Sequence, residues 1–285
     1  MRTKKIKDMK IKNLMLGATL SMFILSCSKD DNNSTSTDLN EAQVSAKIDM
    51  ATEDVAKIAE DQYALQANPG AGRSSEYDVQ ALPPCATVDI QLTATTWTRT
   101  VTFDNCTLPN GNVIDGTIIV SGSLNFDTPS HTISYSFVDF HHNNILIEGN
   151  RTIVRSLQST TTLAAVHPVA NMSIDMTVTF PNGNVYHREG NRVREMIEGF
   201  GTPMVWADNV FSISGSWTTT FPAGTRTSTI TTPLRVEADC PHIVSGVVNT
   251  VGTNNTATLD YGNGDCDNQA TLTVNGNTTT ITLGN

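Results

Sequence analysis

The chain has 285 residues, of which 38% are hydrophobic and 16% charged, and its formal net charge is −10. This acidity argues against nucleic acid as a partner, because an acidic surface repels phosphate. The part from Cys85 onward has about 200 residues, which is enough for one large domain with a sizeable core.

The first 26 residues have the pattern of a secretory signal. A basic segment, residues 2–12, precedes an apolar run over residues 14–25. The run has 12 residues, whereas a helix that crosses a bilayer needs about 20. We therefore predict a signal peptide over residues 1–26.

The end of this signal, Ile24-Leu25-Ser26-Cys27, resembles the bacterial lipobox. In a lipobox the cysteine sulfur receives diacylglycerol and the cysteine becomes the mature N-terminus, so the resemblance implies a lipid anchor at Cys27. The alternative is an ordinary cleaved signal peptide with a chance cysteine. Removal of residues 1–26 takes away six Lys and Arg and one Asp, which leaves a mature net charge of about −15.

The residues after the cysteine refine the predicted location. Ser28-Lys29-Asp30-Asp31 resembles the signal that sends lipoproteins of Bacteroidota to the outer face of the outer membrane. Residues 27–37 also read as a flexible, solvated tether, because their Asn, Ser, Thr and Asp cannot bury enough apolar surface to order themselves. Both interpretations can hold together.

One helical pattern follows, and we predict a helix over residues 38–68. Its apolar stripe has alternating spacings of four and three residues: Val44, Ile48, Ala51, Val55, Ile58, Gln62 and Leu65. Asp38 and Glu41 resemble a capping box, and Asn68-Pro69-Gly70 ends the pattern. We favour a helix laid on its own domain, or a stalk, over an oligomerisation helix with a short coiled-coil seam. Residues 69–84, rich in Gly and Pro, are a predicted linker.

From residue 85 to 285 the sequence predicts an all-β domain. Apolar residues fall on alternate positions, as in the run from Met172 to Phe180, and Thr, Val and Ile dominate. Turn sequences recur between long segments, so we expect about 13 strands in an antiparallel meander. One face of each strand must be covered, and the sheet could fold into a sandwich, close into a barrel-like form or be partly covered by the helix.

Four cysteines remain after Cys27, and their surroundings repeat. Each pair stands near the two ends of a predicted hairpin, Cys85 with Cys106 and Cys240 with Cys266. Four cysteines allow three connectivities, and the repeat favours these two local pairs. Disulfides are expected in an exported protein. A zinc site is the weaker alternative, because no pair has the spacing of a metal-binding knuckle.

The order of these segments resembles a family of Bacteroidota surface lipoproteins. The most specific part is the final cassette, Asp260-Tyr-Gly-Asn-Gly-Asp-Cys-Asp-Asn268. The resemblance implies a location and a fold but no activity or catalytic residues. The turn over residues 107–112 departs from the pattern expected of relatives, so the resemblance assigns no role to it.

No catalytic motif is found, so we predict a protein that is not an enzyme, with no catalytic residues, no cofactor and no metal. The strand over residues 185–197 is polar on both faces, with Arg188, Arg192 and Arg194 on one side and His187, Glu189 and Glu195 on the other. We favour a solvated edge that resists aggregation over a ligand-binding face. If the strand binds a ligand, the three arginines and Trp206 are the candidate residues.

Three other polar groups are weaker candidates. His141, His142 and His187 suggest no third metal ligand, and Asp260, Asp265 and Asp267 fail the spacing of an EF-hand. Trp97 and Trp217 lie in alternating runs and are predicted to be core residues.

Two functions from different classes remain. The favoured hypothesis is a lipid-anchored outer-membrane protein, exposed at the cell surface, with a noncatalytic structural or binding β domain and a polysaccharide or protein ligand. The alternative is an extracellular glycan-acting hydrolase or an accessory glycan-binding protein, because the carboxylate pair of a glycosidase leaves no local motif.

Overall fold

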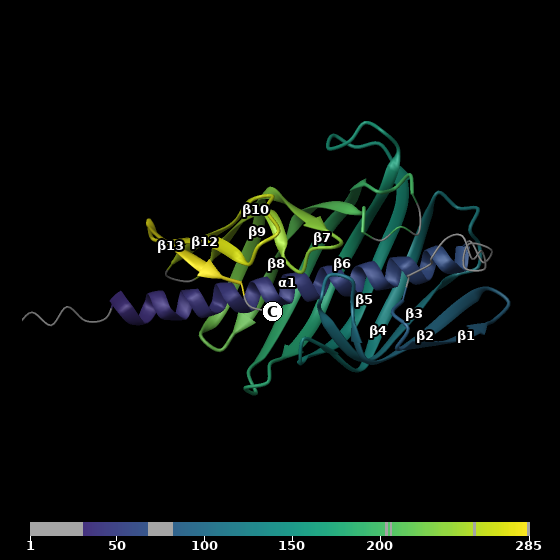
Figure 1. Cartoon of the computed structure of the whole chain (residues 1–285), viewed down its shortest axis with the longest axis horizontal. Coiled ribbons are helices and arrows are strands. Elements are labelled where there is room, and N and C mark those ends of the chain that lie inside the picture. Colours follow the sequence, from purple (N-terminus) through teal and green to yellow (C-terminus); the bar gives the residue numbers. More distant parts are fainter. Residues whose placement is uncertain (1–30, 68–81, 203–204, 206, 253–254, 284–285) are drawn as a thin grey trace, which may run out of the picture.

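A computed structural model describes residues 31–67, 82–202, 205, 207–252 and 255–283. The predicted signal peptide, Cys27, the export signal apart from Asp31, and Trp206 lie outside the described residues. One helix, α1 (Asp31–Ala67), is followed by thirteen strands (Figure 1). These are β1 (Ala86–Leu92), β2 (Thr96–Thr107), β3 (Val113–Ser123), β4 (Ser130–His142), β5 (Ile145–Gln158), β6 (His167–Thr179), β7 (Val185–Glu198), β8 (Val210–Phe221), β9 (Gly224–Glu237), β10 (Ile243–Val251), β11 (Thr256–Asn263), β12 (Gln269–Val274) and β13 (Asn277–Thr282).

All thirteen strands form one antiparallel sheet in which spatial order equals chain order. The fold class predicted from the sequence, a mainly β meander with one N-terminal helix, is confirmed. The sheet does not close, because β1 and β13 remain its two edges. Of the three ways to cover the apolar face, the chain uses the helix.

The sheet curves around α1, which crosses its strands (Figure 1). The helix contacts β3 and β4 near one end of the sheet and β12 and β13 near the other. As a result every residue from Ile48 to Ala59 is buried, although a helix laid on a flat sheet would bury only one stripe. The predicted stripe is buried from Val44 to Gln62, while Leu65 at its end is half-buried, and the polar residues beside the stripe, such as Asp49 and Glu53, are buried too.

The helix differs from its prediction in extent and in surroundings. It begins at Asp31, seven residues before the predicted start at Asp38, so part of the predicted tether is helical. Once a helix is nucleated, adding a residue costs no new nucleation, so the buried segment can propagate into poor helix formers. Because the stripe is covered by its own sheet, the oligomerisation alternative is wrong. Within the described residues, no helix is long and apolar enough to cross a membrane.

Two hydrophobic clusters lie along the helix. One joins α1 to β2 through β6 and to Tyr186 of β7 and Phe221 of β8, and includes Trp97. The other joins Ala46 and Met50 to β8 through β13, and includes Trp217. Trp97 and Trp217 are 0% and 2% exposed, so their prediction as core residues is confirmed. Strand β7 passes between the clusters and carries the polar site described below.

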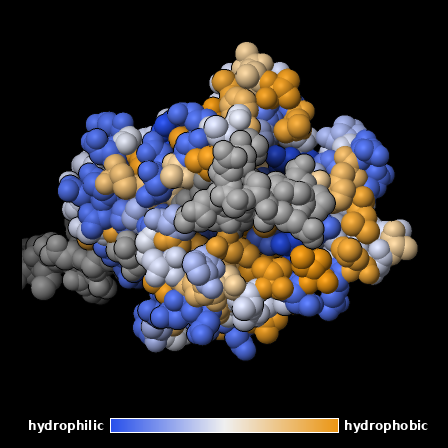
Figure 2. Space-filling view, turned by 45° about the vertical axis from the view of Figure 1, so that its right-hand side comes forward, coloured by the Kyte–Doolittle hydropathy of each residue, from blue (hydrophilic) through white to orange (hydrophobic). Residues whose placement is uncertain are grey.

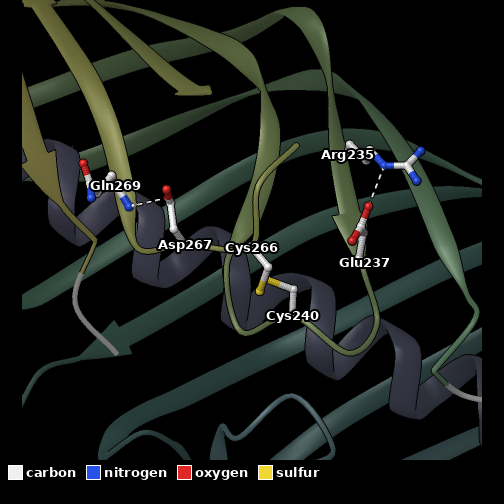
Figure 3. Close-up of a disulfide and its surroundings, with 6 residues drawn as sticks. All are labelled: Arg235, Glu237, Cys240, Cys266, Asp267 and Gln269. Carbon is white, nitrogen blue, oxygen red and sulfur yellow. Dashed lines mark hydrogen bonds and ion pairs between the residues drawn. A yellow bond between two sulfur atoms is a disulfide. The ribbon is translucent and has the colours of Figure 1, made fainter. Parts of the chain in front are cut away.

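Both predicted cysteine pairs are confirmed. Cys85 lies 5.6 Å from Cys106 and Cys240 lies 5.9 Å from Cys266 (Cα to Cα), each pair joined by a disulfide. Figure 3 shows how the second disulfide ties the loop after β9 to the loop after β11. The first of these loops faces the helix, since Pro241 and Met50 line the same hollow. The second disulfide therefore holds a loop at which the sheet meets α1.

Candidate functional site

The candidate site is built on the inner face of β7, the strand that the sequence marks as polar on both faces. The alternation of its side chains is confirmed: Arg188, Arg192 and Arg194 are 0%, 1% and 2% exposed, while His187 and Glu189 are exposed. The solvated-edge interpretation is wrong, because β7 lies between β6 and β8 in the middle of the sheet. The three arginines point toward α1 instead of toward solvent.

Three carboxylates on α1 form ion pairs with these arginines. The Arg188 and Arg192 guanidinium groups both donate to Oδ1 of Asp49. Arg192 also donates to Oε1 of Glu53 at 2.9 Å, and Arg194 donates to Glu60. We call these six residues, Arg188, Arg192, Arg194, Asp49, Glu53 and Glu60, the arginine clamp. It joins residues about 140 positions apart in the chain.

The clamp is balanced, with three guanidinium groups and three carboxylates. Balance matters because a buried charge without a partner is far more costly than a paired one. Burial raises the pKa of the Glu53 carboxyl, and the charges of Arg192 and Arg194 oppose this shift. Burial also lowers the pKa of Arg188 to about 10, against the pull of Asp49. At neutral pH the arginine therefore stays charged.

Aromatic rings complete the surroundings of the arginines. The Arg192 guanidinium carbon lies 4.1 Å from the centroid of the Trp217 ring, and that of Arg188 lies 5.1 Å from it. Arg194 lies over Phe211 at 3.4 Å. These are cation–π distances, and desolvated contacts of this kind are worth up to about 2 kcal/mol. The aromatic partner of Arg188 and Arg192 is thus Trp217, which the sequence placed only in the core.

A glycine makes room for this arrangement. Gly190 lies between Arg188 and Arg192 on the inner face and opposite Trp217 in the neighbouring strand. A Cβ atom at Gly190 would lie 2.4 Å from the Ser216 carbonyl oxygen and 2.5 Å from the Trp217 Cα atom. Only a residue without a side chain lets β8 approach this closely.

A second polar network fixes the other side of the helix. The Asp54 carboxylate accepts from the side-chain amides of Asn110 and Asn112, each at 2.8 Å, and lies 2.7 Å from His142 Nε2. All four residues are buried. Asn110 and Asn112 belong to the turn over residues 107–112, to which the sequence assigns no role, and the structure gives that turn a role in holding α1.

A groove lies between the first buried turns of α1 and the inner face of β8 through β12. A Glu41–Arg226 ion pair at 2.9 Å lines it, and so does the hydroxyl pair of Ser228 and Thr250, also at 2.9 Å. Trp217 lines the groove too, and among the described residues its indole N–H has no hydrogen-bond partner. The groove thus combines an aromatic ring with several hydroxyl and charged groups.

The histidines and aspartates that the sequence offered as weaker candidates do not form a common site. His142 contacts the helix, while His187 lies on the outer face 3.7 Å from Asp175. Asp260 and Asp267 each accept a backbone N–H two residues ahead at 2.9 Å, the second of which is drawn in Figure 3. Across the part of the chain that the structure describes, no group of three or more potential metal ligands occurs.

Sequence reasoning found half of the clamp. The period-two pattern of β7 placed the three arginines on one face. The sequence did not predict the three carboxylates as partners, because the prediction for the helix considered only its apolar stripe. Asp49, Glu53 and Glu60 form a second, acidic stripe beside it, and such a stripe on a helix that must be covered is the signal that could have indicated buried cationic partners.

Comparison of this chain with protein-family models, curated proteins and solved structures gives no match.

Proposed function

We propose that this chain is an outer-membrane lipoprotein, anchored by lipid at Cys27 and exposed at the cell surface, whose β domain has a noncatalytic structural or binding role. Support for the anchor comes from the lipobox and from the Lys-Asp-Asp sequence behind it. Membership in a family of Bacteroidota surface lipoproteins is part of the same proposal.

The observation that carries the structural role is the burial of α1. The helix begins four residues after Cys27 and then forms the centre of the domain. Its hold on the sheet depends on the arginine clamp, the Asp54 network and two hydrophobic clusters. Because the central helix begins close to the anchor, the domain would be held at a short distance from the membrane. Such a position would suit a protein that displays a rigid surface.

The anchor is tested in cells that express the full chain. Cys27→Ser should move the protein from the membrane fraction to the soluble fraction, because stable anchoring requires acyl chains on that cysteine. Ser34→Ala is the matched control and should stay with membranes. Sedimentation of the Cys27→Ser protein with membranes after a salt wash would refute the anchor.

Surface exposure needs a separate experiment. Replacement of Lys29, Asp30 and Asp31 by alanine should leave the protein on membranes but protect it from protease added to intact cells. Equal digestion of the parent protein and this variant would refute the role of the Lys-Asp-Asp sequence in export.

The glycan-binding form of the alternative is favoured by one observation, the groove between α1 and β8 through β12. The groove offers a sugar the half-buried polar side chains of Ser45, Arg226 and Thr250, whereas the Trp217 ring beside them is 2% exposed and already contacts Arg188 and Arg192. Hydrolysis is less favoured there, because the two carboxylates that line the groove, Glu41 and Asp49, are both held in ion pairs with arginines.

The groove is tested with a panel of polysaccharides, scored for both retention and new reducing ends. Ser45→Trp fills the groove from the helix side and should abolish retention, while Ser216→Trp, on an exposed position of β8, should not. Retention that survives Ser45→Trp in a folded protein would exclude the groove. Release of reducing ends would favour the hydrolase.

A further inference from the structure

Strand β1 is the most exposed strand of the sheet. Six of its seven residues are exposed, and it forms one edge, where β2 is its only neighbour among the described strands. An exposed edge strand is a template on which another strand can pair.

The apolar residues of β1 share one face. Val88, Ile90 and Leu92 are 37%, 48% and 61% exposed. They stand opposite Val101, Arg99 and Trp97 of β2, which are buried on the inner face of the sheet. The stripe is therefore an uncovered continuation of the core. Figure 2 shows apolar side chains gathered on the half of the molecule away from the start of α1, the half that holds the first strands.

Both ends of β1 are held in place. The Cys85–Cys106 disulfide joins the residue before the strand to β2. At the other end Thr93 N–H donates to the Thr96 carbonyl at 2.9 Å, and the Thr93 hydroxyl lies 2.7 Å from that of Thr96. A strand that is already ordered loses little entropy when a partner binds.

The opposite edge is different. Strand β13 is made of Asn, Thr and a single Ile, and that Ile281 is buried. Pairing through β13 would cover little apolar surface, so the two edges of the sheet are not equivalent. An association through β1 would pair β1 with β1 and would stop at two copies.

The backbone of β1 limits the possible registers. Since Thr93 is hydrogen-bonded to Thr96, the odd-numbered residues of β1 face β2, and the N–H and C=O groups of Val88, Ile90 and Leu92 face outward. In an antiparallel pair of two β1 strands, the outward-facing N–H and C=O groups of one strand must hydrogen-bond to those of the other. Even-numbered residues therefore stand opposite even-numbered residues. The same condition puts apolar side chains against apolar side chains.

Apolar contact and charge select among the registers that remain. Only an axis at Ile90 pairs all three apolar residues of one strand with those of the other, whereas an axis at Val88 or Gln91 leaves some of them unpaired. A two-fold axis at Asp89 would place two carboxylates opposite each other, which is destabilising. An axis at Ile90 places Ile90 against Ile90 and Val88 against Leu92 on one face, and Asp89 against Gln91 on the other. Within one chain the Gln91 amide already donates to Asp89 at 3.3 Å, so the two side chains are compatible.

We propose that two copies of this chain associate through antiparallel pairing of β1 with β1 about a two-fold axis at Ile90. The pairing forms about six backbone hydrogen bonds, since three residues of each strand face outward. It also covers the apolar stripe of both copies and uses the one apolar edge of the sheet. If the chain is lipid-anchored as proposed above, confinement to the membrane raises the effective concentration of the partners.

The association is tested in solution with the full chain carrying Cys27→Ser, so that neither lipid nor anchoring contributes. Sedimentation equilibrium at high micromolar concentration should give twice the mass of one chain. Ile90→Lys places two ammonium groups at the axis and should give monomers with an unchanged melting temperature. Gln91→Lys, on the other face and opposite Asp89 of the second copy, should remain dimeric.

Cysteine cross-linking tests the register independently of affinity. Under mild oxidation Ile90→Cys should form a covalent dimer, because residues opposite each other in a hydrogen-bonded pair have Cα atoms about 5.5 Å apart, within disulfide range. Asp89→Cys should not, because its two copies would be roughly 8 Å apart. A monomeric parent protein, a dimer that survives Ile90→Lys, or cross-linking through residue 89 in preference to residue 90 would each overturn the proposal.

Discussion

Loss of one carboxylate of the arginine clamp should cost a large part of the stability of the domain. The change with the clearest consequence is Asp49→Asn, which keeps the shape of the side chain and removes its charge. Asp49 binds both Arg188 and Arg192 and lies 3.3 Å from the Tyr261 hydroxyl. The variant would leave three buried arginines with two carboxylates, of which Glu53 is buried and Glu60 is half-buried.

The size of the stability loss depends on which binding partners each arginine keeps in the Asp49→Asn variant. Arg192 retains Glu53 at 2.9 Å, whereas Arg188 retains the Thr219 hydroxyl at 3.0 Å and the Trp217 ring but no carboxylate. Arg188 would therefore become an uncompensated buried charge, a change that typically costs about 3 to 5 kcal/mol. Removal of both charges with Asp49→Asn and Arg188→Met restores balance, so the double variant should recover about 2 to 3 kcal/mol relative to the sum of the single variants.

Urea unfolding at pH 7 with the disulfides intact measures these free energies. Asp175→Asn is the matched control, because that carboxylate is 76% exposed and its pair with His187 should contribute less than about 1 kcal/mol. A loss below about 1 kcal/mol for Asp49→Asn, or strict additivity in the double variant, would refute the view that the clamp is a dry and mutually dependent group.

Three further predictions concern other parts of the domain. Gly190→Ala should lower the free energy of unfolding by about 1 to 3 kcal/mol in urea titrations, because its Cβ would overlap the backbone of β8, while Gly201→Ala, with open space around it, should change it by less than about 0.5 kcal/mol. Removal of the Cys240–Cys266 disulfide by two serines should cost about 3 kcal/mol, given its separation of 26 residues, and a nonreducing peptide map that joins Cys240 to either other partner would contradict the pairing. Burial raises the pKa of Tyr261 well above its ordinary value, so the unfolded phenol, with a pKa near 10, loses its proton first and stability should fall as the pH rises above about 10; denaturant unfolding at pH 9 and pH 11 should show a smaller fall for Tyr261→Phe.

Local patterns were enough to predict the strands and the disulfides. Alternating apolar residues and turn sequences are short-range signals, so the thirteen strands and their chain order could be predicted from the sequence. The cysteine pairs could also be predicted, since each pair spans a short local segment. For the same reason the face of β7 on which Arg188, Arg192 and Arg194 lie was correct.

The sequence by itself determined that this chain is an acidic β meander with one N-terminal helix, two local disulfides and an arginine-rich strand. Only the tertiary structure decided that the sheet curves around the helix, so that a strand that reads as a solvated edge lies at the centre of the domain. The physical reason is that the burial of a charged side chain depends on what it meets across the fold. Arg192 and its partner Glu53 are 139 residues apart in the chain. The spacing of residues within either segment carries no information about which distant segment it will contact.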